Sequence, residues 1–136
     1  LVGEARDAGQ WLSEQAKKLP SGACWIAGGE TTVTLSAEST GLGGRNQEVA
    51  LAAVRGLAGI PDVMLICLAT DGGDGPTDAA GAVVTGDTLA RAEKLGLNPD
   101  EFLARHDAYH FFDALGDLLK PGPTRTNVND LNFLIK

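Results

Sequence analysis

Residues 63–81 read VMLICLATDGGDGPTDAAG, an unbroken apolar run followed by a loop that holds three aspartates among glycines. An apolar run of this kind is typical of a strand that lies inside a sheet and is covered on both faces. In open α/β sheets, ligand-binding residues gather in the loops that follow such strands. The sequence therefore predicts a central strand over residues 63–69 and a ligand site directly after it.

The composition suits one α/β domain. The chain has 136 residues, of which 43% are hydrophobic, enough for a core without disulfide or metal staples. The net charge of -7 and scattered basic residues disfavour a nucleic-acid surface. No run approaches the roughly 18 apolar residues of a membrane span, and no signal-peptide layout is present, so we expect a cytoplasmic protein. Cys24 and Cys67 lie in separate apolar runs, which favours reduced core thiols over a disulfide.

The remaining pattern predicts a layered domain with a mixed β-sheet flanked by helices. Apolar residues recur at helical spacing from Ala5 to Leu19, and this helix offers apolar surface for docking another domain. The first residue is not methionine and the chain runs straight into that helix, so we expect a piece of a longer protein. Strands are predicted at 23–27, 31–35, 82–84 and 131–135. Helices are predicted at 49–57, directly after residues 45–48, and at 87–95, 99–106 and around 109–115.

The second candidate site is the glycine-rich helix start at residues 41–48. Free N–H groups and the helix dipole favour an anion there, and the guanidinium of Arg45 can bind carboxylate or phosphate oxygens in pairs. The stretch departs from the dinucleotide fingerprint because Asn46 stands where glycine or alanine is required. A Walker lysine and a serine-hydrolase elbow are both missing from the sequence.

The aspartates of residues 70–81 have competing interpretations. A calcium loop is disfavoured because Gly73 occupies the position of the second oxygen ligand. A plain turn would also use Asp and Gly. A Mg²⁺ site, in which carboxylates and substrate phosphates bind the same ion, explains three acids after a buried strand better than either a calcium loop or a plain turn does.

Four motifs follow one another along the chain. They are Gly28-Gly29-Glu30-Thr31-Thr32, Gly43-Gly44-Arg45-Asn46-Gln47-Glu48, the acidic glycine loop of residues 70–81, and Gly122-Pro123-Thr124-x-Thr126-Asn127-Val128-Asn129-Asp130. Together they resemble the C-terminal MOFRL domain of glycerate 2-kinases, in a branch also labelled hydroxypyruvate reductase. The resemblance covers residues 1–136. It implies a C-terminal domain that works with a Rossmann-like N-terminal domain carrying an essential lysine.

The resemblance also implies phosphoryl transfer from ATP to the 2-hydroxyl of D-glycerate, with Mg²⁺ and without activity of the isolated domain. The implied catalytic residues are Glu30, Arg45, Asp71 and Asn127, the substrate- or phosphate-binding residues are Gly43, Gly44, Asn46, Glu48, Thr70, Thr124 and Thr126, and the metal ligands are Asp71, Asp74 and Asp78. Glu30 and Asp71 compete for the role of base. The protein is also expected to form a homodimer. Neither nucleic acid nor a membrane is expected as a binding partner.

Two alternatives stay open. The branch label implies an NAD(P)H-dependent hydroxypyruvate reductase, and the same loops would also suit a non-catalytic module that binds a small acid or a partner domain. The chain departs from the family pattern at Arg125, where glycine is expected, and at His106-Asp107-Ala108-Tyr109, where Asn-Asp-Ser-Tyr is expected. Arg125 adds a phosphate contact or blocks the approach of the backbone, and the sequence does not decide between these.

Overall fold

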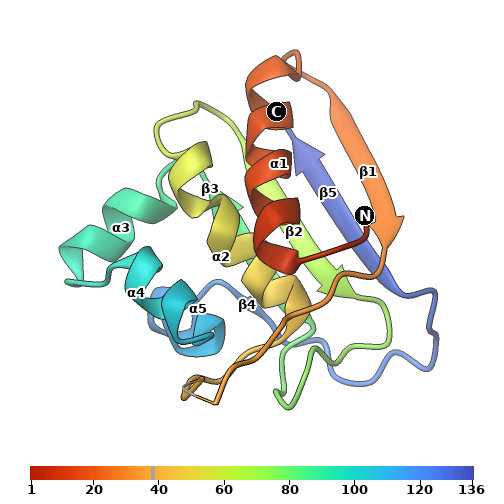
Figure 1. Cartoon of the computed structure of the whole chain (residues 1–136). Coiled ribbons are helices and arrows are strands. Elements are labelled where there is room, and N and C mark those ends of the chain that lie inside the picture. The colour runs from red at the N-terminus through yellow and green to blue at the C-terminus, as the bar shows by residue number, and fades with distance from the viewer. Residues whose placement is uncertain (38) are drawn as a thin grey trace.

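The computed structural model describes residues 1–37 and 39–136, which form a sheet with helices packed against it (Figure 1). The elements follow one another as α1 (Ala5–Lys18), β1 (Cys24–Gly29), α2 (Arg45–Leu57), β2 (Met64–Ala69), β3 (Gly81–Thr85), α3 (Thr88–Lys94), α4 (Pro99–Ala104), α5 (Ala108–Leu115), β4 (Leu118–Leu119) and β5 (Asp130–Ile135). The layered α/β fold predicted from the sequence is confirmed.

The sheet has the strand order β1-β5-β2-β3-β4. β2 lies at the centre, as its apolar run predicted. Each pairing between the five strands is antiparallel, whereas the sequence analysis expected a mixed sheet. The parallel pairing that the structure does contain is an isolated bridge between Glu4 and Thr32.

The predicted strand at residues 31–35 is wrong, because this segment makes only that single bridge. β5 takes the place beside β1 and sets Leu134 opposite Trp25. β1 therefore pairs with a strand more than a hundred residues away rather than with residues 31–35 in a local hairpin. Residues 31–35 instead run past the start of α1, where the backbone N–H of Ala5 donates to Thr32 O at 2.8 Å.

The core lies between one face of the sheet and the helices. Figure 1 shows α1 and α2 side by side across the sheet. Leu12 of α1, Val54 of α2 and Leu65 of β2 are fully buried there. Trp11 of α1 and Trp25 of β1 stack at a tilt with ring centroids 5.3 Å apart. The apolar side of α1 is therefore used mainly inside the domain, although Trp11 remains 45% exposed.

β2 is covered on one face only, so the expectation of burial on both faces is wrong for this chain. Leu65, Cys67 and Ala69 are buried on the helix side, while Met64, Ile66 and Leu68 alternate with them and are not. Both cysteines are free, but Cys24 is exposed rather than part of the core. Burial raises the pKa of the Cys67 thiol well above its usual range.

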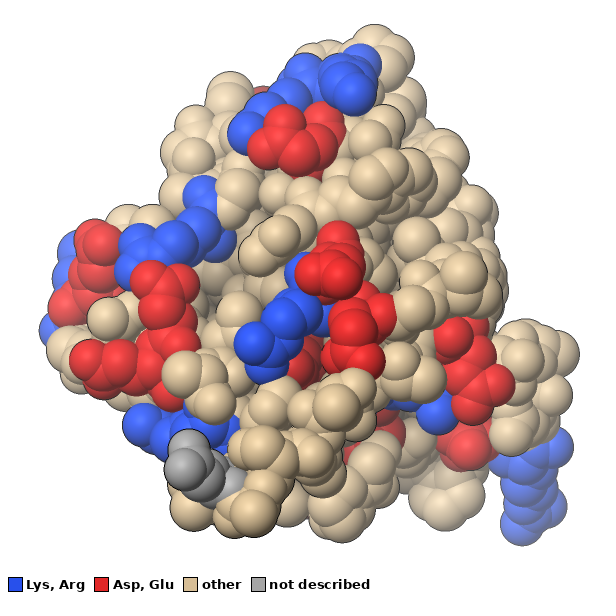
Figure 2. All heavy atoms as spheres, in the orientation of Figure 1, with Lys and Arg blue, Asp and Glu red and all other residues tan. Residues whose placement is uncertain are grey.

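Acidic and basic side chains are interspersed over the helical face of the molecule (Figure 2). This agrees with the scattered basic residues of the sequence. In the described residues, none of the helices combines the length and apolar character that crossing a membrane requires.

Candidate functional site

The side chain of Arg45 sits between two carboxylates at one end of the sheet. Arg45 is the first residue of α2, Glu30 directly follows β1, and Asp130 is the first residue of β5. The Nε of Arg45 donates to Asp130 Oδ2 at 2.6 Å and its Nη2 donates to Oδ1 at 3.1 Å. Its Nη1 lies 3.0 Å from Glu30 Oε1. Three segments that are far apart in the sequence thus meet at one guanidinium.

The two carboxylates differ in burial. The side chain of Asp130 is 4% exposed, whereas that of Glu30 is 55% exposed. The hydrogen bonds that Arg45 donates to Asp130, together with the nearby negative charges, raise the pKa of Arg45. A buried bidentate partner fixes the guanidinium plane, while an exposed ion pair contributes little and exchanges readily with other anions. The Nη1 side of Arg45 is therefore the side that an incoming anion can reach.

The start of α2 is capped by a carboxylate of the chain itself. Asp74, which is 2% exposed, accepts the backbone N–H of Asn46 at 3.1 Å and that of Gln47 at 2.9 Å. The side-chain amide of Asn46 donates to the same carboxylate at 3.2 Å. Burial raises the pKa of Asp74 despite these hydrogen bonds. The free N–H groups that suggested an external anion here are thus already satisfied in part by Asp74.

The acidic glycine loop packs between two other glycine segments. A Cβ at Gly44 would lie 2.2 Å from Asp74 Cγ, and a Cβ at Gly72 would lie 2.1 Å from Gly122 O. Gly72 also has a φ of +94°, which side chains rarely adopt. The loop can therefore approach residues 43–44 on one side and Gly122 on the other only because these positions lack side chains.

The loop that carries Asn127 is tied to the end of β2. The Thr70 hydroxyl donates to Asn129 O at 2.7 Å, and the backbone N–H of Thr124 donates to Asp71 O at 3.1 Å. The Thr124 hydroxyl also donates to Thr70 O. These bonds hold residues 122–130 against Asp71. The loop itself is exposed, including Thr126, Asn127 and Arg125, and Arg125 has a positive φ of 62°.

The three aspartates of the glycine loop are placed differently. Asp71 is exposed, and its Oδ1 accepts the N–H of Gly73 at 3.1 Å. Asp78 accepts the Tyr109 hydroxyl at 2.7 Å and lies 3.4 Å from Lys120 Nζ. The Tyr109 hydrogen bond lowers the pKa of Asp78. With Asp74 committed to α2, Asp71 is the aspartate of this loop whose carboxylate is most open to a ligand.

A cavity of about 300 Å³ lies beside Arg45. It is lined by Val33, Leu35, Gly41, Gly43, Gly44, Arg45, Glu48, Gly75, Pro76 and His106. Glu48 forms its buried floor, with a side chain that is 4% exposed. A second cavity of about 410 Å³ is lined by other residues of the glycine loop, including Asp71 and Asp78, and by Gly122. The loop therefore contributes to two cavities.

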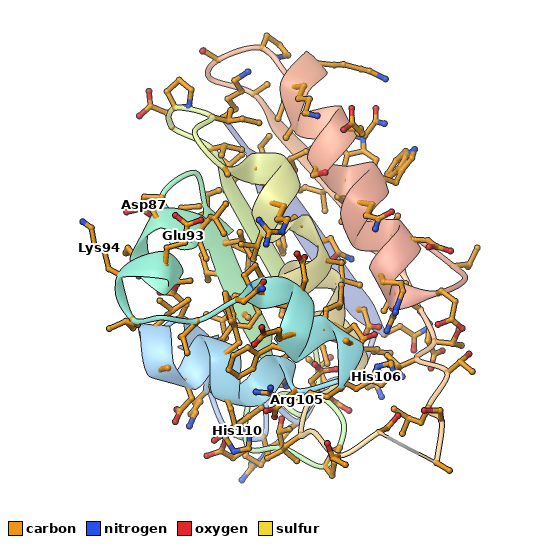
Figure 3. The ribbon with its side chains drawn as sticks, turned by 60° about the vertical axis from the view of Figure 1, so that its left-hand side comes forward. Asp87, Glu93, Lys94, Arg105, His106 and His110 are labelled. Atoms are coloured by element: carbon orange, nitrogen blue, oxygen red, sulfur yellow. The ribbon has the colours of Figure 1, made fainter. Side chains whose placement is uncertain are left out.

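Glu48 is held by two basic side chains. Its Oε2 lies 2.9 Å from His106 Nδ1, and its Oε1 accepts Arg6 Nη2 at 3.2 Å. His106 lies where α4 ends and the chain turns toward α5 (Figure 3). The φ of His106 is 56°, which is an uncommon backbone conformation for a residue other than glycine. Glu48 thus connects α1, α2 and the turn before α5.

Asp130, His106 and Arg6 also belong to this region, although they were not among the site residues predicted from the sequence. The structure brings Glu30 to Arg45, Asn46 to Asp74, and Thr70, Asp71 and Thr124 to one another. Asn127 lies on the same loop as Thr124, and its side-chain oxygen accepts the N–H of Asn129 at 2.9 Å. Asp130 had one signal in the sequence, because it is the acid that directly precedes the last apolar strand.

Comparison with known proteins places these segments in a family. The MOFRL family model matches residues 23–130. The "Putative hydroxypyruvate reductase" of Agrobacterium vitis is 44% identical and covers 99% of this chain, and the D-glycerate 2-kinase of Thermotoga maritima is 44% identical and covers 94%. The chain spans 37% and 32% of the lengths of these two relatives, or about a third.

Solved structures agree with this match. The crystal structure of glycerate kinase from Thermotoga maritima superposes with a TM-score of 0.94 at 43% identity, over 99% of this chain and 34% of that one. The crystal structure of a Pyrococcus horikoshii protein gives a TM-score of 0.92 at 37% identity, over 99% of this chain and 32% of that one.

Proposed function

Because the chain belongs to the MOFRL family, we propose that it forms the C-terminal third of a glycerate 2-kinase. The intact protein transfers the γ-phosphoryl group of ATP to the 2-hydroxyl of D-glycerate, which gives ADP and 2-phosphoglycerate and releases the hydroxyl proton. The observation that carries the proposal is Arg45, which Asp130 holds in place with its Nη1 directed at the exposed Glu30. Phosphoryl transfer depends mainly on positioning and charge neutralisation, and a fixed guanidinium supplies both.

In this proposal Arg45 binds the carboxylate of glycerate or a phosphate of the nucleotide. The incoming anion replaces Glu30 at Nη1 and leaves the two bonds to Asp130 intact. Glu30, released from the ion pair, is then close enough to accept the proton of the 2-hydroxyl. Asp71 is the competing candidate for this base.

The chain fits Mg²⁺ only in part. In the described residues no group of three or more His, Cys, Asp or Glu side chains could hold a metal ion. Mg²⁺ bound to a nucleotide takes most of its ligands from phosphates and water, so one exposed carboxylate is enough from this domain. Asp71 fits that role, whereas Asp74 caps α2 and Asp78 bonds to Tyr109 and Lys120. The bound ion would neutralise charge on the phosphates of ATP.

The other implied residues are supporting in this proposal. Gly43 and Gly44 line the 300 Å³ cavity, which is large enough for a three-carbon acid, and Glu48 forms its floor. Asn46 fixes Asp74, and Thr70, Thr124 and Thr126 shape the loop that presents Asn127. Asn127 would orient the substrate by hydrogen bonds from its exposed amide.

The rest of the site is proposed to come from an N-terminal domain that carries the catalytic lysine. We expect the 136 residues alone to be inactive, since half of the cleft is then missing. The two free thiols fit a cytoplasmic protein. A homodimer remains a proposed assembly.

The name of the Agrobacterium vitis relative favours one other candidate, an NAD(P)H-dependent hydroxypyruvate reductase. The helix start does not support a dinucleotide site, because Asn46 replaces the glycine or alanine of the fingerprint and is 1% exposed against Asp74. A coupled assay of the full-length protein with ATP and D-glycerate, beside an NADH assay with hydroxypyruvate, separates the two.

We expect ADP release only in the first assay, and an Arg45→Ala loss of about 10²- to 10³-fold in kcat/KM. Asp71→Asn is measured beside it. Turnover of hydroxypyruvate with NADH, or unchanged kinase turnover in both variants, would contradict the proposal. Binding of glycerate and Mg-ATP without turnover in either assay would instead indicate a non-catalytic binding module.

A further inference from the structure

The face of the sheet opposite the helices is open and apolar. Side chains on this face alternate with less exposed ones along β1, β2 and β5, and with buried ones at the end of β3. The antiparallel register aligns them across the sheet, with Ile26 opposite Phe133 and Phe133 opposite Ile66. The members of this open face are Cys24, Ile26, Leu131, Phe133, Ile135, Met64, Ile66, Leu68, Val83 and Thr85.

The open face carries no charged side chain among these members. Ile26 is 59% exposed, Met64 is 37% exposed and Ile135 is 36% exposed. Contiguous apolar surface of this kind marks an interaction site on a folded protein. Three of these members, Met64, Ile66 and Leu68, belong to the apolar run of β2. An unbroken run of this kind is typical of a strand that is covered on both faces.

We propose that the open face is the docking surface for the remainder of the same polypeptide, which presents an apolar surface to it. This inference rests on the proposed function, in which the chain is about a third of a kinase. Relatives named D-glycerate 2-kinase have about two thirds of their length outside the matched region. That length is sufficient for at least one further domain.

The area of the open face favours this occupant over a second copy of the chain. Three of its strands have six residues and β3 has five, so the face is about 20 Å long and about 20 Å wide, or roughly 400 Å². A stable complex of two free proteins buries about 800 Å² on each partner. Contacts between domains of one chain are stable with about 300–750 Å² a side, because the covalent link supplies a high local concentration.

The position of the open face also suits this occupant. Leu68 and Leu131 of the open face pair with each other next to Ala69 and Asp130, where the strands end at the site. A domain that covers the sheet therefore reaches the strand ends beside Arg45 and can form the missing wall of the cleft. α1 offers less for this docking, since its apolar residues are buried inside the domain apart from Trp11.

Cys24 provides a built-in probe, because it is an exposed thiol on the open face. The full-length protein is treated with a maleimide under native conditions and in urea, and labelling of the peptide that contains Cys24 is followed by mass spectrometry. Ile26→Cys supplies a second thiol on the open face. Gln10→Cys, at an exposed position of α1, is the matched control.

We expect labelling at positions 24 and 26 to be at least tenfold slower than at position 10 in the native protein, and equal to it in urea. Labelling at positions 24 and 26 that stays slow when the full-length protein is diluted to a monomer supports the proposal. Slow labelling that is lost on dilution assigns the open face to a second copy and overturns it, as does fast native labelling. Kinase activity is measured on the same preparation, so that failure of the proposed function is recorded separately from the labelling result.

Discussion

Asp130 binds Arg45 through both of its carboxylate oxygens, although the two residues are 85 positions apart in the chain. The pair joins the first residue of α2 to the first residue of β5. The guanidinium is thereby oriented by a strand in the middle of the sheet rather than by a loop. A site built on regular elements holds its geometry more closely than one built on loops.

Asp130→Asn tests this orientation. The amide keeps the shape of the carboxylate but can accept only one of the two hydrogen bonds, so Arg45 loses its fixed plane. We expect kcat/KM of the full-length kinase to fall about 100-fold and the free energy of unfolding to fall by about 2 kcal/mol. Steady-state kinetics and urea unfolding measure the two effects.

Glu30→Gln is the control for stability, because this partner of Arg45 is 55% exposed and its ion pair is screened by water. Its free energy of unfolding should stay within about 0.5 kcal/mol of the parent.

The prediction for Asp130→Asn can also fail. Full kinase activity in that variant would show that the orientation of Arg45 is unimportant for the reaction.

Asp74→Ala tests the capping of α2. The substitution leaves the buried N–H groups of Asn46 and Gln47 without their acceptor, so we expect a loss of about 2 kcal/mol in the free energy of unfolding. Urea unfolding followed by circular dichroism measures it. A change below about 0.5 kcal/mol would show that other groups or water replace the cap.

Asp74 also predicts a pH dependence. Burial raises the pKa of Asp74 in the folded state, so the folded protein keeps this proton to a higher pH than the unfolded chain does. The contribution of Asp74 to stability is therefore complete below its unfolded pKa of about 4 and is lost as the pH rises through the folded pKa. Relative to Asp74→Asn, the parent should lose stability as the pH increases. A difference that grows with pH would mean that the sign is wrong.

Gly44→Ala tests the close packing of the glycine loop. The added Cβ would lie 2.2 Å from Asp74 Cγ and 2.5 Å from the backbone carbon of Asp74, so the loop must move. We expect a destabilisation of about 1–3 kcal/mol. Gly73→Ala in the same loop is the matched control, since its Cβ would meet nothing within 4 Å and its φ is not positive. Equal thermal unfolding of the two variants would contradict this packing argument.

The pair of Glu48 and His106 predicts a measurable coupling. Both side chains are largely buried, at 4% and 12% exposed, so water screens their interaction weakly. A double-mutant cycle with Glu48→Gln and His106→Asn at pH 6 should give a coupling of about 1 kcal/mol or more. The exposed pair of Glu14 and Lys17, with side chains that are 58% and 50% exposed, should give less than about 0.5 kcal/mol. Coupling no larger than in this surface pair would argue against an organising role for Glu48.

Local pattern was sufficient for most helices and for the central strand. The helix starting at Asn98-Pro99 was predicted from its cap, and the Asn98 side chain accepts the N–H of Asp100 at 3.0 Å. The partner of β1 could not be predicted in this way. The β-branched run at residues 31–35 has the pattern of a strand, but in the structure it does not join the sheet. Pairing with β5 depends on contacts more than a hundred residues apart.

The candidate residues Arg45 and Asp71 were predicted from their glycine-rich surroundings, and Glu30 was predicted from the family resemblance. The contacts of Asp130 and His106 could not be predicted, because their partners lie 85 and 58 residues away in the chain. The apolar run of β2 likewise predicted burial on both faces, but in this chain the helices cover only one of them.

Trp11 and Trp25 are the two tryptophans of the chain, and they stack where α1 crosses β1. Intrinsic fluorescence of this domain therefore reports whether its first helix is seated on its first strand. A change in the tryptophan spectrum on adding substrate would reveal motion between α1 and β1, whereas ligand binding confined to the glycine loops would leave the spectrum unchanged.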